Sequence, residues 1–333
     1  MLWLGNQPAR ILYFITMENN RFDVIVLGGG PAGLTAAIYL SRARLRTLVL
    51  NIGTAGGQMV LTHEVANYPG VESVSGYTLS NTMKKQAKSF GSVIKNIASI
   101  QQLTLNGDVK QVVTGDGTVY ESDAVILATG GRSRELGVEG ERQFKGKGIS
   151  YCATCDGEFF TDKEIIVIGG GNSALEEAVS LTKYASHITI VHQFDYFQAF
   201  EYAIEEAKQN TKISFKLNSV ISKFQGGESF DGAYIKDVNT GEESFIKSSG
   251  AFIFIGYQPN TEVLKGIVEL NKWGEIVVDS EMKTSLDGVF AAGDAIAKRY
   301  RQITTSVGEA TVAALATAGW LHEQRRKKVS LAH

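Results

Sequence analysis

Cysteine is scarce in this chain, because Cys152 and Cys155 are the only two in 333 residues. A static disulfide would stabilise little, since closing so short a loop hardly restricts the unfolded chain. Zinc needs four thiolate or imidazole ligands, and of the five histidines only His187 and His192 lie near each other, so we predict no metal site. Two cysteines in a C-x-x-C pattern favour redox chemistry, because the second thiol can resolve a mixed disulfide formed by the first.

The sequence also lacks an excess of basic residues and a long apolar run. The net charge is −2, and without a basic excess nucleic acid is disfavoured as a partner. No apolar run reaches the ~18 to 20 residues that span a bilayer, so we expect no membrane insertion.

Residues 1–16 are interpreted as an N-terminal extension without a cleavage site, with Met17 as an alternative start. We expect the protein to be cytoplasmic, and in the cytoplasm a lone C-x-x-C pair is catalytic rather than structural.

Glycine is abundant, with 36 residues, and one group forms a recognisable pattern. An apolar strand is predicted over residues 22–27, a G-x-G-x-x-G turn over 28–33, a helix over 34–42 and a second strand over 47–50. Such a turn lets backbone amides and a helix N-terminus meet a pyrophosphate. The acidic residue that usually binds the ribose is replaced by Asn51, which could still bind a hydroxyl.

The same pattern returns later in the chain. A strand is predicted over residues 164–168, a glycine turn over 169–174, a helix over 175–184 and a strand over 187–191. The residue that follows the second strand, Asn51 or His192, lies 23 residues after the first glycine of the turn in both copies. The repeat predicts two nucleotide-binding units built on one plan.

The remaining segments indicate how the two copies are connected. Buried strands are predicted over residues 124–127 and 251–255, a further strand over 288–294 delivers Asp294 to a helix N-terminus, and an alanine-rich helix is predicted over 308–321. The economical arrangement returns this last segment to the first copy. We therefore predict a discontinuous first domain of residues 17–131 and 259–333 and an inserted domain of residues 132–258, with hinges near Gly131 and Gln258.

Five signatures in this order resemble the low-molecular-weight thioredoxin reductases, over essentially all of residues 22–321. They are Gly28 to Gly33, Ala128-Thr129-Gly130, Cys152-Ala153-Thr154-Cys155-Asp156-Gly157, Gly169 to Ala174, and Gly293-Asp294 with Arg301-Gln302. The resemblance implies an α/β protein with two Rossmann-like, three-layer ββα domains, a homodimer that uses FAD to reduce thioredoxin-like protein disulfides. Electrons would pass from FAD to the cysteine pair and then to the partner disulfide.

The resemblance also implies residue roles. Cys155 would face the flavin, Cys152 would attack the partner disulfide and Asp156 would donate the proton. The residues implied for FAD are Gly28, Gly30, Pro31, Ala32, Gly33, Asn51, Gln58, Asn67, Thr129, Gly130, Gly293, Asp294, Gln302 and Ile303. Those of the NAD(P)-type site, interpreted as a relic, are Gly169, Gly171, Asn172, Ser173, Ala174 and His192.

One part of the family pattern is missing. Members that use NADPH place three arginines after the second strand of the second copy, where this chain has Gln193, Phe194 and Gln198. No lysine or arginine occurs between Lys183 and Lys208. A 2′-phosphate would lack charged partners, so the sequence disfavours NADPH. NADH and ferredoxin remain as electron donors, and we favour ferredoxin, whose docking the basic residues 325–328 could assist.

Two further functions stay open at the level of sequence. A non-enzymatic redox sensor could use the flavin and the cysteine pair to change a partner surface. A ferredoxin–NADP reductase-like enzyme has related architecture, although the cysteine pair and the missing arginines argue against it.

Overall fold

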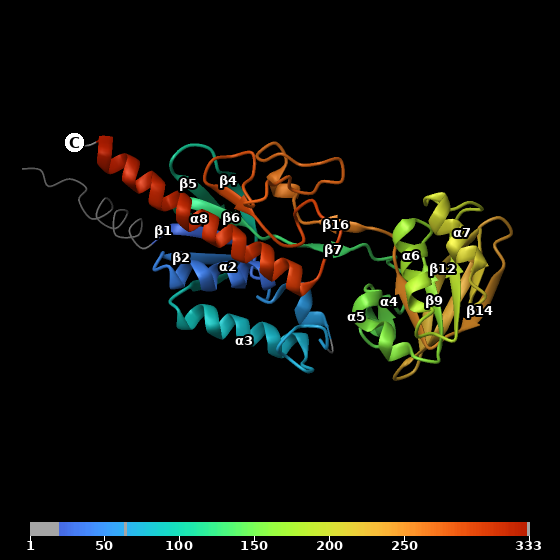
Figure 1. Ribbon diagram of the computed structural model, residues 1–333. Helices are drawn as coiled ribbons and strands as arrows, with labels where there is room; N and C mark the ends of the chain where they lie inside the picture. The colour runs from blue at the N-terminus through green and yellow to red at the C-terminus, as the bar shows by residue number, and fades with distance from the viewer. Residues whose placement is uncertain (1–19, 63–64, 332–333) are drawn as a thin grey trace, which may run out of the picture. The chain divides into compact units, whose positions relative to one another are not determined.

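Figure 1 shows a computed structural model of the chain, which describes residues 20–62 and 65–331. The interpretation of residues 1–16 and Met17 falls outside the described residues. The chain divides into two compact units. The first comprises the chain up to residue 64, Tyr68–Arg132 and Pro259–His333, and the second comprises Val65–Asn67 and Ser133–Gln258. The first junction lies one residue after the predicted one, and Asn67 falls in the second unit.

The first unit is built on a seven-stranded sheet in the order β3-β2-β1-β6-β5-β4, with β17 beside β6. Its strands are β1 (Arg21–Leu27), β2 (Thr47–Ile52), β3 (Val93–Ile97), β4 (Ile100–Thr104), β5 (Lys110–Thr114), β6 (Val119–Leu127) and β17 (Val289–Ala291). The first half of β6 pairs antiparallel with β5, and its second half pairs parallel with β17. Strand β1 is parallel to β2 and β6 and buried along Val24 to Leu27, as expected for a sheet covered on both faces.

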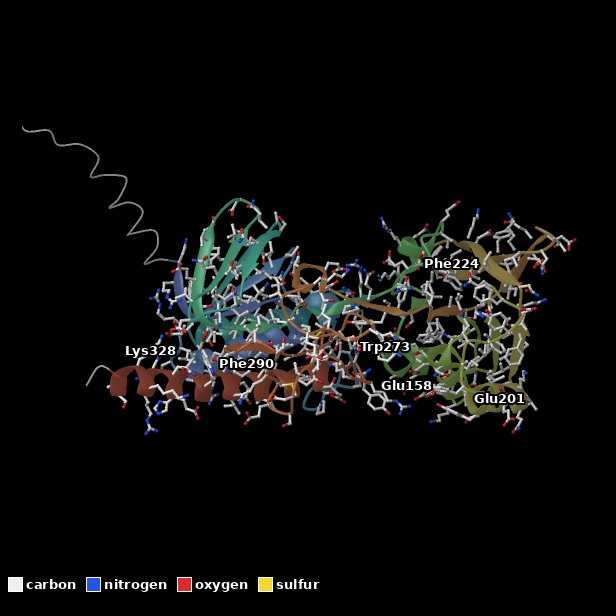
Figure 2. The ribbon with its side chains drawn as sticks, turned by 90° about the horizontal axis from the view of Figure 1, so that it is seen from above. Glu158, Glu201, Phe224, Trp273, Phe290 and Lys328 are labelled. Carbon is white, nitrogen blue, oxygen red and sulfur yellow. A yellow bond between two sulfur atoms is a disulfide. The ribbon has the colours of Figure 1, made fainter. Side chains whose placement is uncertain are left out.

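Three helices pack on one face of this sheet: α2 (Pro31–Arg42), α3 (Gly76–Ser89) and α8 (Ile303–Leu331). Phe290 of β17 lies in this helix-covered core (Figure 2). On the opposite face, the parallel strands share a hydrophobic core with β4 and β5, the antiparallel end of the same sheet, and with the loops around the 3-10 helix η3 (Glu262–Leu264). The 3-10 helix η1 (Gly57–Leu61) lies near α3. Helix α8 is longer than the predicted 308–321, because residues 322–331 contain no glycine or proline to end it.

The second unit has a parallel five-stranded sheet in the order β11-β10-β9-β15-β8. Its strands are β8 (Ile149–Ser150), β9 (Glu164–Ile168), β10 (His187–Val191), β11 (Ile213–Lys216) and β15 (Gly250–Ile253). An antiparallel sheet covers one face and consists of β12 (Ser219–Gly226), β13 (Phe230–Asp237) and β14 (Glu243–Lys247). Helices α6 (Asn172–Leu181) and α7 (Glu201–Gln209) cover the other face.

Short elements complete this unit: α4 (Glu141–Phe144), α5 (Ala153–Asp156) and the 3-10 helix η2 (Gly157–Phe160). The linkers between the units contain β7 (Gly131–Ser133) and β16 (Tyr257–Pro259), which pair with each other. The α/β fold with two Rossmann-like domains is thereby confirmed. Within residues 20–62 and 65–331, every helix is too short or too polar to cross a bilayer.

Candidate active site

The two cysteines form a disulfide at the start of a single helical turn. Cys152 is the N-cap of α5, and its Cα atom lies 5.3 Å from that of Cys155. The Cys155 N–H points at Cys152 Sγ at 3.2 Å. After reduction, this N–H can stabilise negative charge on Cys152 Sγ, because a backbone donor aimed at a sulfur favours its thiolate.

Asp156 is tied to the cysteine loop by one hydroxyl group. The Ser150 hydroxyl donates to Asp156 Oδ2 at 2.5 Å and accepts the Cys152 N–H at 3.1 Å. Burial raises the pKa of Asp156 above its ordinary value, and the bond from Ser150 lowers it only partly. Asp156 is therefore easier to protonate than an exposed aspartate, and the hydroxyl bridge holds it beside the cysteine backbone.

Tyr151 anchors the other side of this loop to a buried carboxylate. Its O–H donates to Glu141 Oε1 at 2.6 Å, while the backbone N–H groups of Leu136 and Gly137 donate to the same carboxylate at 2.9 and 2.6 Å. Glu141 is 1% exposed. Burial and this carboxylate raise the pKa of Tyr151, so the phenol stays protonated and remains a donor.

The first glycine turn has no room for side chains at two predicted positions. A Cβ atom on Gly28, where φ is +109°, would lie 2.1 Å from the Ala128 carbonyl oxygen, and one on Gly33 would lie 1.8 Å from the Gly28 carbonyl oxygen. Pro31 occupies the first turn of α2, and no described side chain caps that N-terminus. Its amide groups are therefore available to an anion.

Several predicted FAD residues lie around this turn. Gly293 packs on Ala32, where an added Cβ would come within 2.7 Å, and Gly57, next to Gln58, lies against Gly30. The Thr129 hydroxyl oxygen is buried and has no hydrogen-bond partner in the described part of the chain, which suits a site completed by a polar ligand. These features fit the pyrophosphate-bearing cofactor FAD.

The Asn51 side chain is hydrogen-bonded to the backbone around the first glycine turn. Its Oδ1 accepts the Gly29 N–H at 2.8 Å, and its Nδ2 donates to the carbonyl oxygens of Ile52 and Gly53 at 3.3 and 2.9 Å. Because these bonds engage both polar atoms of the amide, Asn51 braces the glycine turn itself. Its Oδ1 has a second lone pair, so a bond from a ribose hydroxyl to Asn51 stays a prediction.

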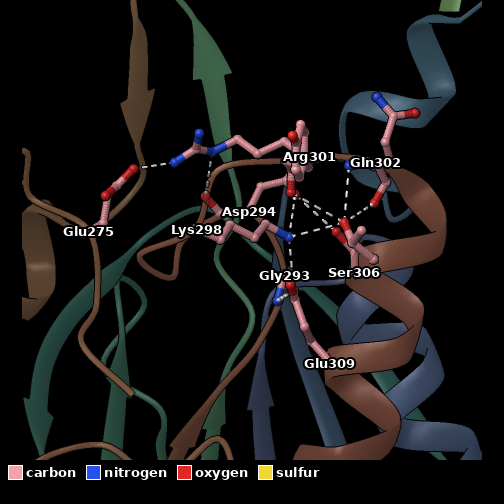
Figure 3. Close-up of polar contacts among 10 residues, drawn as sticks. Glu275, Gly293, Asp294, Lys298, Arg301, Gln302, Ser306 and Glu309 are labelled. Carbon is pink, nitrogen blue, oxygen red and sulfur yellow. Dashed lines mark hydrogen bonds and ion pairs between the residues drawn. The ribbon is translucent and has the colours of Figure 1, made fainter. Parts of the chain in front are cut away.

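The Gly293–Asp294 turn is joined to the start of α8 by polar contacts (Figure 3). The Ser306 hydroxyl donates to Asp294 Oδ1 at 2.9 Å. Gln302, just before Ile303 begins the helix, donates its N–H to Thr305 Oγ1 at 3.1 Å. The predicted residues Asp294, Gln302 and Ile303 are thus held together, whereas the Gly130 carbonyl oxygen accepts the Asn260 N–H at 2.9 Å.

The second glycine turn is bonded to a later segment of its own unit. The Gln198 N–H donates to the Gly170 carbonyl at 2.8 Å, and the Phe200 N–H donates to Asn172 Oδ1 at 2.7 Å. Asn172, Ser173 and Ala174 were predicted as part of the turn but form the first residues of α6, which ends at Leu181 rather than at residue 184. The side chain of Asn172, which was predicted for the nucleotide site, is therefore hydrogen-bonded within the protein.

His192 offers no positive charge to this turn. Its ring is 5% exposed and packs on Gly170, where an added Cβ would lie 2.4 Å away, and it stacks on Phe197 with ring centroids 5.7 Å apart. Burial lowers the pKa of His192 below its ordinary value of 6.5, so the ring is neutral at about pH 7. Two other aromatic side chains of the segment after His192, Tyr196 and Phe200, are 58% and 63% exposed, so they are not part of the buried core.

Sequence reasoning did not identify Ser150, Glu141 or the partners of Asp294. A serine two residues before a C-x-x-C is a signal that could have been noticed, since a hydroxyl there can reach the next backbone N–H. Glu141 comes from a separate element, so no local spacing marks it.

Comparison with known proteins agrees with this geometry. Residues 22–310 match the family described as pyridine nucleotide-disulphide oxidoreductase. A thioredoxin reductase from Mycolicibacterium smegmatis is 44% identical over 304 residues, covering 91% of this chain and 97% of that protein. A 34.2 kDa protein in the rubredoxin operon of Clostridium pasteurianum is 43% identical over 298 residues, covering 90% and 96%.

A solved structure has the same fold. The thioredoxin reductase from Streptococcus pyogenes MGAS5005 matches with a TM-score of 0.88 at 38% identity, covering 92% of this chain and 99% of that one. The extent of these matches exceeds what a shared nucleotide-binding turn alone would produce. The chain therefore belongs to the pyridine nucleotide-disulphide oxidoreductase family, among its thioredoxin reductases, and is a flavoprotein disulfide oxidoreductase.

Proposed function

We propose that this protein reduces the disulfide of a thioredoxin-like protein with electrons from bound FAD, and that a protein such as ferredoxin, rather than NADPH, supplies those electrons. The observation that carries the first part is the Cys152–Cys155 disulfide with Asp156 held beside it through Ser150. Its thioredoxin reductase relatives support the same activity.

The cysteine pair can perform the exchange in two steps. The Cys152 thiolate attacks one sulfur of the partner disulfide and forms a mixed disulfide, and the other partner sulfur leaves as a thiolate that takes a proton from Asp156. The Cys155 thiolate then attacks Cys152 Sγ. This step releases the second partner thiolate and restores the Cys152–Cys155 disulfide with both electrons transferred to the partner.

The first unit would hold the cofactor. FAD, when bound and reduced by the electron donor, would supply the two electrons that reduce the Cys152–Cys155 disulfide. Gly28, Gly30 and Gly33 would admit its pyrophosphate to the amide groups at the start of α2, and Asp294 would accept a hydrogen bond from its ribityl hydroxyls. The orphan hydroxyl of Thr129 supports this placement.

The second glycine turn supports a donor other than NADPH. Gln193, Phe194 and Gln198 cannot form charge-assisted bonds to a 2′-phosphate, and His192 is neutral. Two missing contacts of this kind correspond to about 3 to 6 kcal/mol, or about 10²- to 10⁴-fold in Kd. NADH avoids this penalty but also finds no Asp or Glu at the position where the ribose diol is usually bound.

The basic segment near the C-terminus gives limited support for donor docking. Arg325 pairs with Asp23 and Asp123, and Lys328 Nζ lies 3.7 Å from Asp108. These intramolecular pairs offset part of the positive charge of Arg325 and Lys328. We therefore propose that the donor does not dock on these two side chains alone.

Anaerobic titration of the FAD-loaded protein tests the donor. We expect stoichiometric NADPH to leave the flavin absorbance unchanged, whereas reduced ferredoxin bleaches it, with dithionite as the control for full reduction. Parallel titration with NADH decides whether the second unit still accepts a nucleotide. Rapid bleaching by stoichiometric NADPH would refute the proposed donor but leave the disulfide reductase activity intact.

Replacing Asp156 by asparagine tests its role as the acid. We expect turnover with a thioredoxin-like disulfide to fall about 10²-fold, because the leaving thiolate loses its proton donor. In contrast to turnover, the stability of the folded protein should increase in the asparagine variant at neutral and higher pH. The folded pKa of Asp156 is raised, so the wild-type protein loses stability as pH rises through that pKa, and the asparagine variant does not.

The measurement compares Tm of both proteins below and above that pKa. The variant should have the higher Tm at about pH 8, and the difference should vanish at about pH 3, where the aspartate is protonated in both states. Asp231→Asn, the same substitution at an exposed position of the same unit, is the control. Wild-type turnover in the Asp156→Asn variant would exclude the proton-donor role.

A further inference from the structure

Lys298 lies between two carboxylates at the turn that carries Asp294. Its Nζ is 3.1 Å from Asp294 Oδ1 and 2.8 Å from Glu309 Oε2, and its side chain is only 10% exposed (Figure 3). The same Glu309 oxygen accepts the Gly293 N–H at 3.1 Å. One ammonium group therefore joins the turn after β17 to the second turn of α8.

Among the described residues, the contacts of Asp294 leave one of its carboxylate oxygens for a ligand. Lys298 Nζ and the Ser306 hydroxyl both contact Oδ1, so Asp294 can offer Oδ2. The Arg301 side chain contacts the Asp294 carbonyl oxygen at 3.5 Å and pairs with Glu275, which fixes the backbone beyond the turn. These neighbours hold the Asp294 carboxylate in its orientation.

The charge balance makes Lys298 the critical neighbour. Asp294 and Glu309 carry two negative charges, and the charged group that faces both is Lys298. Burial raises the pKa of Glu309, while Lys298 and the Gly293 N–H lower it. Without the ammonium group, the two carboxylates would repel each other, and they could approach only by sharing a proton.

We propose that Lys298 is a positioning residue for FAD: with Glu309 it fixes the Asp294 carboxylate so that Oδ2 meets the ribityl hydroxyls, and it keeps FAD affinity independent of pH. This rests on the proposed function, because Asp294 is taken as an FAD ligand. Lys298 itself neither touches substrate nor transfers a proton. Its effect reaches the cofactor through Asp294.

The test measures FAD release from the diluted holoprotein by the fluorescence of free FAD, over about pH 5 to 8. At the upper end of this pH range, we expect Lys298→Met to raise the Kd of FAD about 10- to 100-fold, because a bond to a charged group is lost. The Kd should decrease again toward low pH, because the two carboxylates then hold a proton. The wild-type Kd should stay constant with pH.

Two further variants separate positioning from a general structural effect. Lys298→Arg keeps the positive charge and should restore a Kd that does not change with pH. In the double variant Lys298→Met/Glu309→Gln the repulsion is gone, while the glutamine can still accept the Gly293 N–H, so the pH dependence should disappear. Lys283→Met removes an exposed lysine of the same unit, paired with Glu281, and serves as the matched control.

The outcomes are distinguishable from failure of the proposed function. If the wild-type protein retains no FAD, the proposed function fails. If the wild-type protein binds FAD and Lys298→Met binds it equally at every pH, only the positioning role is overturned. The positioning role is also overturned if Lys298→Met raises the Kd of FAD by the same factor at every pH and the double variant shows that same Kd. Circular dichroism of each variant shows whether the protein is folded.

Discussion

Cys152→Ser is expected to reduce turnover with a thioredoxin-like disulfide by about 10³-fold or more, because the variant lacks the thiolate that attacks the partner. Cys155→Ser should lose turnover to a similar degree for another reason. Its Cys152 thiolate still attacks, but no second thiol resolves the mixed disulfide. The two variants therefore fail at successive steps and can be distinguished.

Intact-mass measurement under non-reducing conditions makes this distinction. After reduction and mixing with a thioredoxin-like protein, Cys155→Ser should accumulate a covalent adduct with that protein, and Cys152→Ser should not. Thr154→Ser, at the exposed position between the cysteines, is the matched control and should retain wild-type turnover. An adduct formed by Cys152→Ser instead would reverse the assigned order of attack.

Local backbone demands explain which parts of this protein could be predicted from the sequence. Gly28 and Gly169 each have positive φ, +109° and +139°, a conformation that glycine adopts at little cost. Their spacing from the strands that follow is therefore readable in the sequence. The paired cysteines were recognised for a similar reason, because both members lie within one helical turn.

Side chains that meet across the fold could not be predicted in this way. Lys298 and Glu309 lie 11 residues apart and meet only because α8 returns beside β17. The bond between the Asn51 amide and the glycine turn was not predicted either, because the close approach of β2 to that turn is a tertiary contact. Such pairings depend on packing, which no local pattern encodes.

Gly28→Ala and Gly30→Ala are expected to separate folding from cofactor binding. At Gly28 a methyl group would lie 2.1 Å from the Ala128 carbonyl oxygen at a φ of +109°. Backbone strain and overpacking together should lower the free energy of unfolding by about 2 to 6 kcal/mol. At Gly30 the nearest atom, the Gly57 Cα, is 3.6 Å away and φ is −77°, so the loss should be about 1 kcal/mol, the difference between glycine and alanine at an N-cap.

The Gly30 variant is the more informative of the two, because its methyl group would point into the space where the start of α2 must meet the pyrophosphate. Displacing one backbone bond to a charged group should raise the Kd of FAD about 10- to 100-fold. Fluorescence of released FAD measures this, and urea denaturation measures stability. Gly117→Ala is the control for an alanine at positive φ, +81°, in open space. If Gly30→Ala binds FAD as tightly as the wild-type protein, the pyrophosphate does not lie over this turn, and the first unit must hold its cofactor in another way.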